Sequence, residues 1–402
     1  MRKLRSFSPL CGNVRGRLET HLSLRSYSSC GTDLERWQRR CDRLTQLQRR
    51  IRFPPLETLT VKGKDVKLPL PAAEPLRSPR KEELEYLVGF FDGDGCISLN
   101  KASGTAQLVI SQNVDSAEVL LRFRSLLGGS VSRQSVSTGS HKATLQWRVC
   151  GSKMTAAADA LSSVPSMKQA QLLIAASGRV AENDRARVAQ RLQSFKKGQH
   201  VPDQLPESSW RYVAGFFDAE GCIMVRATGV GLRLEVGQVN PCILAQVLRI
   251  LHGKGLRAWS LNHRSACSKL VCTSLEECSQ TLELLLANGL LVKRQQAELA
   301  LSLSAENHLH IRDAISSLKG LQGRYQRLDS AGIARAREIR SLQKRLRRLA
   351  GPEHATMLSQ LDKLRAQHNL LKLIYHCHLL RKDMRKSLRL GGRVVPPTTC
   401  SS

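Results

Sequence analysis

The spacing of apolar residues divides the chain into a helix, an extended stretch and a long folded body. Apolar side chains recur every three or four residues over positions 34–51, with arginine and glutamine on the opposite face, which predicts one amphipathic helix. The pair Pro54-Pro55 ends this helix, and four more prolines between positions 69 and 79 predict an extended linker, because proline blocks helix continuation. We expect the folded body to begin near Lys81.

One apolar segment of the body occurs twice. Residues 86–97 read YLVGFFDGDGCI and residues 212–223 read YVAGFFDAEGCI, with eight identities in twelve positions at a constant offset of 126. The register continues to Gln112 and Gln238, each 18 residues after an acid of the repeat. A period of this length indicates two domain-sized halves rather than a solenoid of short repeats.

Both halves show the same predicted order of helix, hairpin, helix, hairpin and helix, which indicates an α+β fold with antiparallel sheets. In the first half we expect helices over 82–92 and 117–127, strands over 96–100, 106–111, 130–136 and 144–149, and further helices through 175. In the second half we expect helices over 210–218, 242–252 and 276–287, and strands over 222–227, 232–238, 256–261 and 269–272.

A basic, helical tail follows from about residue 305 to residue 390, broken at Gly351-Pro352. Two interpretations of it are open: solvated amphipathic helices packed on the body, or an added phosphate-binding arm. The predicted domains are a leader over 1–31, the helix and linker over 32–80, two related domains over 81–205 and 206–320, and the extension over 321–402.

The net charge of the chain predicts what kind of partner it binds. Lysine and arginine number 63 against 33 acids, for a formal charge of +30, while 41% hydrophobic residues suffice for a packed core. A polyanionic partner is expected, and nucleic acid is favoured over an anionic membrane surface. Long apolar runs are missing, so we expect no membrane-spanning helix. The twelve cysteines form no CxxC pair, so we expect no zinc site, and free, mostly buried thiols instead.

The first 31 residues have a composition of their own. They hold six basic residues and six serines against one acid, which is typical of an organelle transit peptide. Residues 25–28, Arg-Ser-Tyr-Ser, resemble the R-x-Y-S cleavage signal of mitochondrial presequences. We therefore predict a mitochondrial protein, with a chloroplast address or a basic tail that binds nucleic acid as the alternatives.

Four glycines of the repeat have predicted roles. Gly89 and Gly215 sit within helices, where glycine costs about 0.5–1 kcal/mol relative to alanine. That cost is tolerable if two helices approach closely there. Gly95 and Gly221 follow the helices and suit a left-handed C-terminal cap.

Two acids, Asp94 and Glu220, then lie at the ends of two touching helices. Carboxylates oppose the helix dipole there and repel each other, so divalent cations, Mg²⁺ above all, are expected beside them. With a phosphate present, this arrangement predicts metal-assisted hydrolysis. A calcium-binding loop is disfavoured, because Ser103 stands where an EF-hand needs glutamate.

The motifs LVGFFDGDG at 87–95 and VAGFFDAEG at 213–221 resemble those of the LAGLIDADG homing endonuclease and maturase family, in its single-chain, double-motif form. The resemblance covers about residues 82–320. It implies a duplicated αββαββα fold, with two pseudo-symmetric halves whose saddle-shaped antiparallel sheets face nucleic acid, plus helical extensions that the family does not share. It also implies a monomer with internal pseudo-two-fold symmetry.

The resemblance assigns roles to particular residues. Asp94 and Glu220 occupy the metal-binding positions for Mg²⁺ or another divalent cation, and the carbonyls of Gly93 and Ala219 complete the metal shell. Outward strand residues are candidates for nucleic-acid contact in the groove, or else plain solvent-facing sheet: Ser98, Asn100, Lys101, Gln107, Arg226 and Arg233.

Three further residues match catalytic positions of the family. Gln112 and Gln238 match a glutamine that orders solvent around the phosphate, although both could instead cap strands. Lys293 matches a lysine near the scissile phosphate, and an ordinary surface lysine is its alternative. Counted back from Gln169-Ala170, the first-half counterpart of Lys293 is Ser166, with Lys168 on a different helix face. An asymmetric reaction site is therefore expected.

The implied function is site-specific nucleic-acid binding by a divalent-metal-dependent endodeoxyribonuclease that makes double-strand cuts. The alternative is a non-cleaving RNA-binding maturase or RNA-processing factor for organellar introns, and a weaker one is a structural subunit of an organellar ribonucleoprotein. Retention of both acids favours the enzyme, because a pure binder needs no repulsive carboxylate pair. The leader and the basic tail favour a role on structured RNA.

Overall fold

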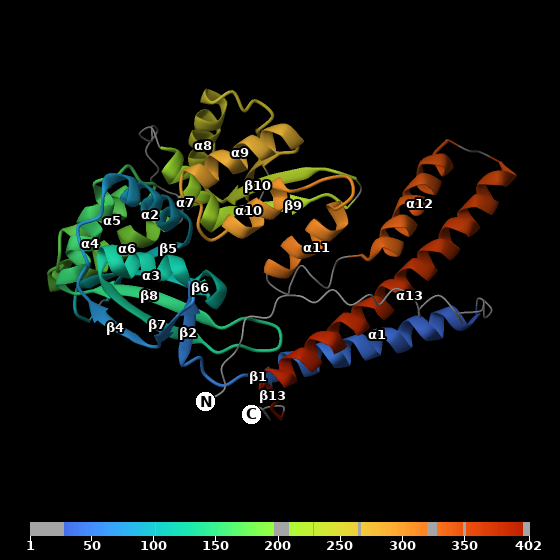
Figure 1. The fold of residues 1–402 in the computed structure, drawn as a ribbon, viewed down its shortest axis with the longest axis horizontal. Helices are drawn as coiled ribbons and strands as arrows, with labels where there is room; N and C mark the ends of the chain where they lie inside the picture. The colour runs from blue at the N-terminus through green and yellow to red at the C-terminus, as the bar shows by residue number, and fades with distance from the viewer. Residues whose placement is uncertain are drawn as a thin grey trace. The chain divides into compact units, whose positions relative to one another are not determined.

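The computed structural model describes residues 28–100, 102–196, 209–227, 229–263, 267–319, 328–348 and 351–396. The chain forms two compact units, one of Met1–Arg43 with Leu328–His378 and one of Leu44–Arg327 with Leu379–Ser402. Two of the three boundaries fall within the helices α1 (Ser28–Arg49) and α13 (Pro352–Arg389), and the third precedes Leu328 (Figure 1). Among the described residues, no helix is long and apolar enough to cross a membrane. Most of the predicted leader lies outside the described residues.

The larger unit contains the predicted αββαββα order twice, which confirms the duplicated α+β fold (Figure 1). The first copy consists of α2 (Lys81–Asp94), β5 (Gly95–Asn100), β6 (Thr105–Asn113), α3 (Ala117–Leu127), β7 (Gly129–Ser135), β8 (Thr144–Cys150) and α4 (Ser152–Ser162). The second consists of α7 (Trp210–Glu220), β9 (Gly221–Val225), β10 (Leu232–Gln238), α8 (Pro241–Gly253), β11 (Ser260–Asn262), β12 (Ser268–Cys272) and α9 (Leu275–Ala287). Further helices follow each copy: α5 (Gln169–Ala176) and α6 (Arg185–Lys196), then α10 (Arg294–Leu301) and α11 (His308–Leu318).

Each copy builds one antiparallel sheet, in the orders β4-β7-β8-β6-β5 and β11-β12-β10-β9. Alternation along the strands decides which face is covered. In β6, Ala106, Leu108 and Ile110 are buried, and the residues between them point to the other face. Helices α3 and α4 pack on the first sheet and α8 and α9 on the second, so both sheets keep one mainly polar face.

The predicted linker is wrong in part, because residues 51–73 contain strands. These are β1 (Ile51–Arg52), β2 (Thr58–Val61), β3 (Lys64–Lys67) and β4 (Leu70–Ala73). Strand β4 pairs with β7, so the folded body begins before Lys81. Pro71 is tolerated in β4 because this strand lies at the sheet edge, where a missing N–H breaks no ladder. Strand β1 pairs with β13 (Arg393–Val394) near the other end of the chain.

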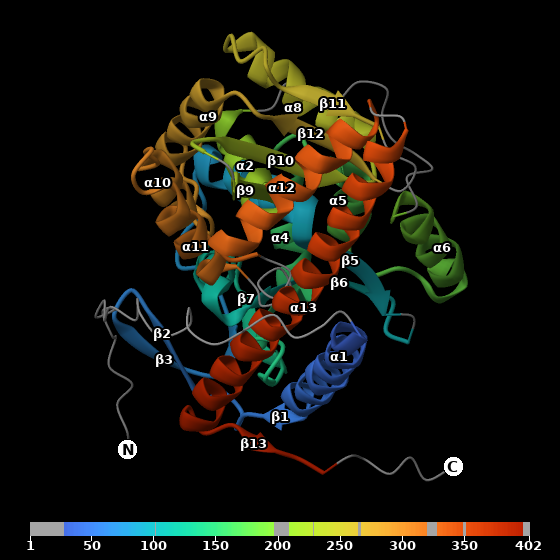
Figure 2. The same ribbon diagram turned by 90° about the vertical axis from the view of Figure 1, so that its right-hand side faces the viewer.

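The smaller unit is helical, as the tail pattern predicts. Helix α12 (Ser330–Leu346) packs on α13 through Leu342, Leu346 and Leu361, and the two helices lie side by side in both views (Figure 1, Figure 2). Helix α13 starts at Pro352, after the predicted break. The predicted N-terminal helix is confirmed as α1, where the Cys41 thiol lies 3.2 Å from Nδ1 of His376 on α13.

The nine cysteines whose side chains the structure describes form no disulfide, in agreement with the predicted thiols. Only four of them are buried, so the expectation of mostly buried thiols is wrong. Cys96 and Cys150 are exposed because they lie at strand positions outside the apolar alternation.

Candidate active site

Helices α2 and α7 meet at the predicted glycines. A Cβ atom added to Gly89 would lie 2.1 Å from the Tyr212 carbonyl oxygen, and one added to Gly215 would lie 2.0 Å from the Tyr86 carbonyl oxygen. Real Cβ contacts essentially never fall under 3.0 Å. The close-packed interface predicted from the sequence is therefore confirmed, and each glycine makes room for the backbone of the other helix.

The helix ends also touch. A Cβ atom on Gly93 would lie 2.4 Å from the Ala219 Cβ, so any side chain at Gly93 would push the helix ends apart. The next residue in each helix is the acid of the motif. Asp94 and Glu220 are consequently near neighbours, and the negative charge of Asp94 acts on Glu220.

A reciprocal pair of buried hydrogen bonds joins the two halves. Tyr86 donates from its hydroxyl to Oδ2 of Asp218 at 2.7 Å, and Tyr212 donates to Oδ2 of Asp92 at 2.7 Å. Each tyrosine thus binds the aspartate of the other copy. All four residues are identities of the repeat, which is the sequence signal that could have pointed to them.

The same aspartates fix the turn that carries a lysine. Asp92 accepts hydrogen bonds from the backbone N–H groups of Met167 and Lys168 at 2.7 and 3.2 Å. Asp218 accepts from those of Val292 and Lys293 at 3.0 and 2.8 Å. Burial raises the pKa of both carboxyl groups, although the nearby lysine and these hydrogen bonds oppose the rise.

Removing one tyrosine hydroxyl should weaken the joint between the halves. We expect Tyr212→Phe to lower the free energy of unfolding by about 1–3 kcal/mol, because a buried carboxylate loses a donor. Urea unfolding of Tyr212→Phe, Asp92→Asn and the double variant measures the coupling, which should reach about 1 kcal/mol. Fully additive losses would contradict the cross-copy bond.

This geometry corrects the predicted counterpart of Lys293. Lys168 is the residue just before α5, as Lys293 is just before α10, and the two bind equivalent aspartates. Ser166 instead donates from Oγ to Oδ1 of Asp92 at 2.7 Å. The Gln-Ala alignment is two residues out of register at the helix start, so the expected asymmetry is wrong.

The two lysines take equivalent places near the ends of the motif helices. Lys168 donates from Nζ to the carbonyl oxygens of Phe91 and Gly95, both at 2.6 Å. Lys293 donates from Nζ to the carbonyl oxygen of Asp218. Cations are favoured at helix C-termini. Burial lowers the pKa of both lysines, although the surrounding acids oppose that effect.

The predicted glutamines lie against the predicted acids. Gln112 donates from Nε2 to Oδ2 of Asp94 at 2.6 Å, and Gln238 donates from Nε2 to Oε1 of Glu220 at 3.1 Å. Both amides reach across from the second strand of the hairpin that follows the helix. The sequence register of 18 residues therefore corresponds to a real contact in each half.

Both acids resist ionisation. Asp94 is exposed at the surface, but the protein atoms around its carboxylate displace part of its water, and this desolvation raises its pKa against the Gln112 hydrogen bond and the lysine charges. Burial also raises the pKa of the half-buried Glu220, and repulsion from Asp94 adds to the rise. A cation beside the pair would relieve this repulsion.

The glycines after the acids do not form left-handed caps. Gly95 has φ −76° and Gly221 has φ −72°, which is extended backbone open to any residue. The need for glycine is steric instead, since an added Cβ would lie 2.3 Å from the Phe91 ring in one case and 2.6 Å from the Phe217 ring in the other.

No protein-family model and no curated protein sequence matches this chain. Several solved structures are similar to it. The LAGLIDADG meganuclease I-AabMI bound to uncleaved DNA is 16% identical, over 59% of this chain and 99% of its own, with a TM-score of 0.43. I-GzeII, a LAGLIDADG homing endonuclease in complex with a DNA target, is 15% identical over 59% and 96%, with a TM-score of 0.40. The LAGLIDADG meganuclease I-CpaMI, bound to uncleaved DNA, is 15% identical over 58% and 98%, with a TM-score of 0.42.

The chain resembles the LAGLIDADG homing endonucleases. Similarity this distant shows nothing about activity.

The polar face of the first sheet carries mainly uncharged side chains beside the exposed Arg148, which lies opposite Val109 of β6. Ser98 accepts a hydrogen bond from Nε2 of Gln107 at 2.9 Å, and the exposed Asn100 accepts from the backbone N–H of Ala102 at 2.9 Å. Lys101, the charged candidate of this hairpin, lies outside the described residues. Amide and hydroxyl groups of this kind can read base edges but supply no attraction to phosphate.

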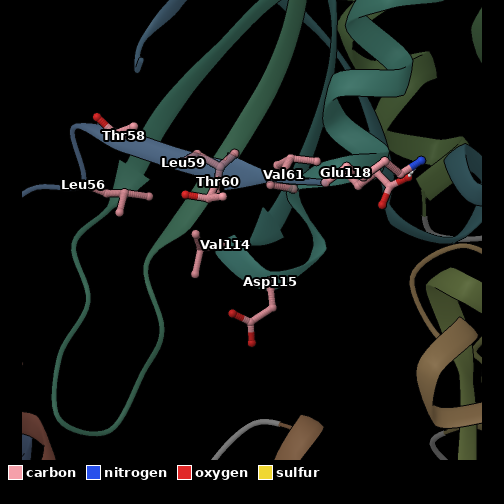
Figure 3. Close-up of a pocket in the computed structure, with 10 residues that line it drawn as sticks. Leu56, Thr58, Leu59, Thr60, Val61, Val114, Asp115 and Glu118 are labelled. Carbon is pink, nitrogen blue, oxygen red and sulfur yellow. Dashed lines mark ion pairs between the residues drawn. The ribbon is translucent and has the colours of Figure 1, made fainter. Parts of the chain in front are cut away.

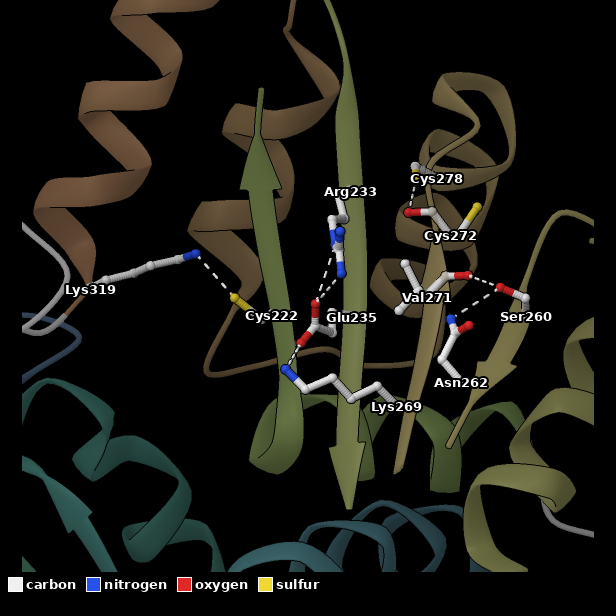
Figure 4. Close-up of polar contacts among 10 residues, drawn as sticks. All are labelled: Cys222, Arg233, Glu235, Ser260, Asn262, Lys269, Val271, Cys272, Cys278 and Lys319. Carbon is white, nitrogen blue, oxygen red and sulfur yellow. Dashed lines mark hydrogen bonds and ion pairs between the residues drawn. The ribbon is translucent and has the colours of Figure 1, made fainter. Parts of the chain in front are cut away.

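In the second sheet, most of the positive charge on this face is paired. Arg233 and Lys269 both bind the carboxylate of Glu235, which Figure 4 shows between them. Burial works against the charged form of Glu235, but these two partners outweigh it and lower its pKa. Arg226, the remaining candidate, is exposed and donates to the Thr273 carbonyl oxygen at 3.4 Å.

A hollow of about 380 Å³ lies between strand β2 and the start of α3. Thr60, Asp115 and Glu118 contribute polar groups to it, beside Leu56 and Val114 (Figure 3). Its polar groups are shared with ion pairs to Lys62 and Lys142, so its lining is already largely satisfied.

The donor set at the acids suits a hard divalent cation. No cluster of three or more His, Cys, Asp or Glu side chains forms a ready metal cage among the described residues. Two carboxylates remain, Asp94 and Glu220, and Mg²⁺ is commonly held by one or two carboxylates with water and substrate phosphate oxygens rather than by an all-protein cage. The residues therefore fit Mg²⁺ bound together with substrate.

Proposed function

We propose that this protein binds a specific nucleic-acid site across its two sheets and hydrolyses phosphodiester bonds in DNA with a divalent metal. One observation carries the proposal. The two halves hold matching sets of an acid, an amide and a lysine: Asp94 with Gln112 and Lys168, and Glu220 with Gln238 and Lys293. A pure binder has no need for two carboxylates whose ionisation is opposed by burial.

Each group has a task in this proposal. Asp94 and Glu220 would hold the metal, one acid for each strand, with the backbone carbonyls of Gly93 and Ala219 as further ligands. Bound there, Mg²⁺ would activate water and stabilise the leaving oxygen. Gln112 and Gln238 orient the carboxylates and the solvent beside them, and the lysine ammonium groups offset charge that develops on the attacked phosphate.

Recognition falls to the polar faces of the sheets. Gln107, Asn100 and Ser98 offer donors and acceptors suited to base edges. Arg226 and Arg233 extend the same surface in the second half. A single-chain protein with two such sheets binds as a monomer with internal pseudo-two-fold symmetry.

Releasing the two cations held by Glu235 should change how the second sheet binds. We expect Glu235→Gln to free Arg233 and Lys269 for contacts with phosphates. Non-specific duplex binding should tighten, and the slope of log affinity against log salt concentration should steepen by about one to two. Fluorescence anisotropy at several salt concentrations measures both quantities. The matched control is Glu298→Gln, an exposed ion-paired acid on α10; equal effects of the two variants would contradict the assignment.

The function itself can be tested without knowing the target. The purified protein is incubated with a randomised DNA library and Mg²⁺, and cut ends are captured and sequenced, with the Asp94→Asn, Glu220→Gln double variant as the blank. Enrichment of one long site with the active protein alone supports the proposal. Equal cutting by both proteins, or none, contradicts it.

A role on RNA remains the second candidate, favoured by the charge of the extension. Residues 328–402 carry sixteen lysines and arginines against five acids. Recovery of one intron RNA by crosslinking, together with no DNA cleavage, would favour a maturase or RNA-processing factor. We propose a mitochondrial location on the composition of residues 1–31 and the R-x-Y-S match, with a chloroplast address as the alternative.

A further inference from the structure

In the smaller unit, five exposed cations lie along helix α12 and the turn that directly follows its last residue, Leu346. They fall on one side at spacings of three or four residues: Arg337, Arg340 and Lys344 on the helix, then Arg347 and Arg348 in the turn. We call this set the α12 stripe. Residues at such spacings share one face of a helix, so the stripe is a continuous surface about 16 Å long.

The other face of α12 explains why the stripe points outward. Leu342 and Leu346, with Ile339, pack on α13 through Leu361. This apolar seam holds the helix by its opposite side. The stripe is therefore not needed to attach the helix.

The charge of the stripe is not neutralised by the part of the chain that the structure describes. None of its five residues forms an ion pair with another residue of the described ranges. Helix α12 has one acid, Glu338, off the stripe. Five like charges on one face raise the energy of the free protein and favour a partner of opposite charge.

We propose that the α12 stripe is a second nucleic-acid-binding site, which takes the phosphate backbone of a double helix without reading sequence. Four of its five residues are arginines, whose planar groups bind phosphates in bidentate geometry. A duplex carries about ten phosphate charges over 16 Å of its axis. The proposal does not rest on cleavage at Asp94 and Glu220.

Other polyanions fit the stripe less well. A membrane-binding helix presents apolar side chains to the bilayer beside its cations, but the apolar face of α12 is occupied by α13. Non-specific single-strand binding uses aromatic side chains for base stacking, and α12 contains none. The stripe thus has the groups for phosphates and lacks those for bases or lipid tails.

The test compares two full-length variants of equal charge. One replaces four stripe residues, Arg337→Gln, Arg340→Gln, Lys344→Gln and Arg348→Gln; the control makes the same number of changes at exposed positions of the larger unit, Lys64→Gln, Lys67→Gln, Lys254→Gln and Arg257→Gln. Glutamine is nearly as good a helix former as arginine, so α12 should persist, which circular dichroism and the melting temperature check. Binding to 30-base-pair duplexes of unrelated sequence, one of DNA and one of RNA, is measured by anisotropy in EDTA at several salt concentrations.

The stripe variant should bind both duplexes at least about ten-fold more weakly at low salt, and its log–log salt slope should fall by about three. The control should change the slope by less than about one. An unchanged stripe variant, or equal losses in the two variants, would overturn the proposal. A loss on one sequence but not on another would overturn it too, since it would indicate base reading. Because no metal is present, none of these results depends on whether the protein cleaves.

Discussion

Replacing Gly215 with alanine should unfold much of the joint between the two halves. The added Cβ would lie 2.0 Å from the Tyr86 carbonyl oxygen and 2.9 Å from the Phe90 nitrogen, both backbone atoms of α2. Backbone cannot rotate away as a side chain can, so the helices must separate. Separation also strains the hydrogen bonds between tyrosine and aspartate across the interface. We expect a loss of at least about 3 kcal/mol, or roughly 6 °C or more in melting temperature.

Gly253→Ala is the matched control. Gly253 is the last residue of helix α8, and no heavy atom lies within 4 Å of the Cβ it would gain. That variant should melt at the wild-type temperature or up to a few degrees above it, because alanine is the better helix former. Gly89→Ala should behave like Gly215→Ala, given its contact of 2.1 Å with Tyr212. If Gly215→Ala and Gly253→Ala melted alike, the close approach of α2 and α7 would be wrong.

Elements with strong local signals could be predicted closely. Helix α3 and strand β10 have the predicted bounds, since glycines or turn residues flank a clear apolar period. Duplication of the motif also predicts the contact between helices α2 and α7, because close approach of two helices explains a glycine inside both of them. Where local signals conflict, prediction fails. Strand β4 contains proline, and only its pairing with β7 makes that position an edge strand.

Which side chains pair across the two halves could not be predicted, although the repeat marks those residues as identities. Tyr212 and Asp92 are 120 residues apart, and their bond exists only because the two halves dock. The position of the lysine relative to the helix that follows it could not be predicted either. Gln169-Ala170 matches Gln296-Ala297 in letters, whereas the position of Lys168 follows from where helix α5 starts. A helix start set by a buried aspartate leaves no mark in the letters alone.

Replacing the Asp94 carboxylate with an amide should stabilise the fold, even though it removes a proposed metal ligand. The pKa of Asp94 is raised, so its folded form releases a proton less readily than the unfolded chain, and ionisation costs stability once the pH exceeds the ordinary aspartate value. We therefore expect Asp94→Asn to raise the melting temperature by roughly 1–3 °C at pH 7 in EDTA. The gain should disappear as the pH falls below the ordinary aspartate pKa, where the acid is protonated in both states. Asp159→Asn, at an exposed position of α4, is the control for the loss of one carboxylate, and a gain of the same size there would contradict the role given to Asp94.

Replacing both acids, by Asp94→Asn together with Glu220→Gln, should abolish cleavage while leaving nucleic-acid binding intact. Asparagine still accepts the Gln112 hydrogen bond and glutamine at position 220 still accepts that of Gln238, so the fold around the site is retained. What is lost is the anionic ligand for the metal, and we expect the double variant to cleave at least about a thousand-fold more slowly. Each single variant should cut one strand, because the two acids serve different strands. On a supercoiled plasmid bearing the selected site, Asp94→Asn or Glu220→Gln should give nicked circles where the wild type gives linear DNA. Linear product from either single variant at the wild-type rate would rule out the assignment of one acid to each strand.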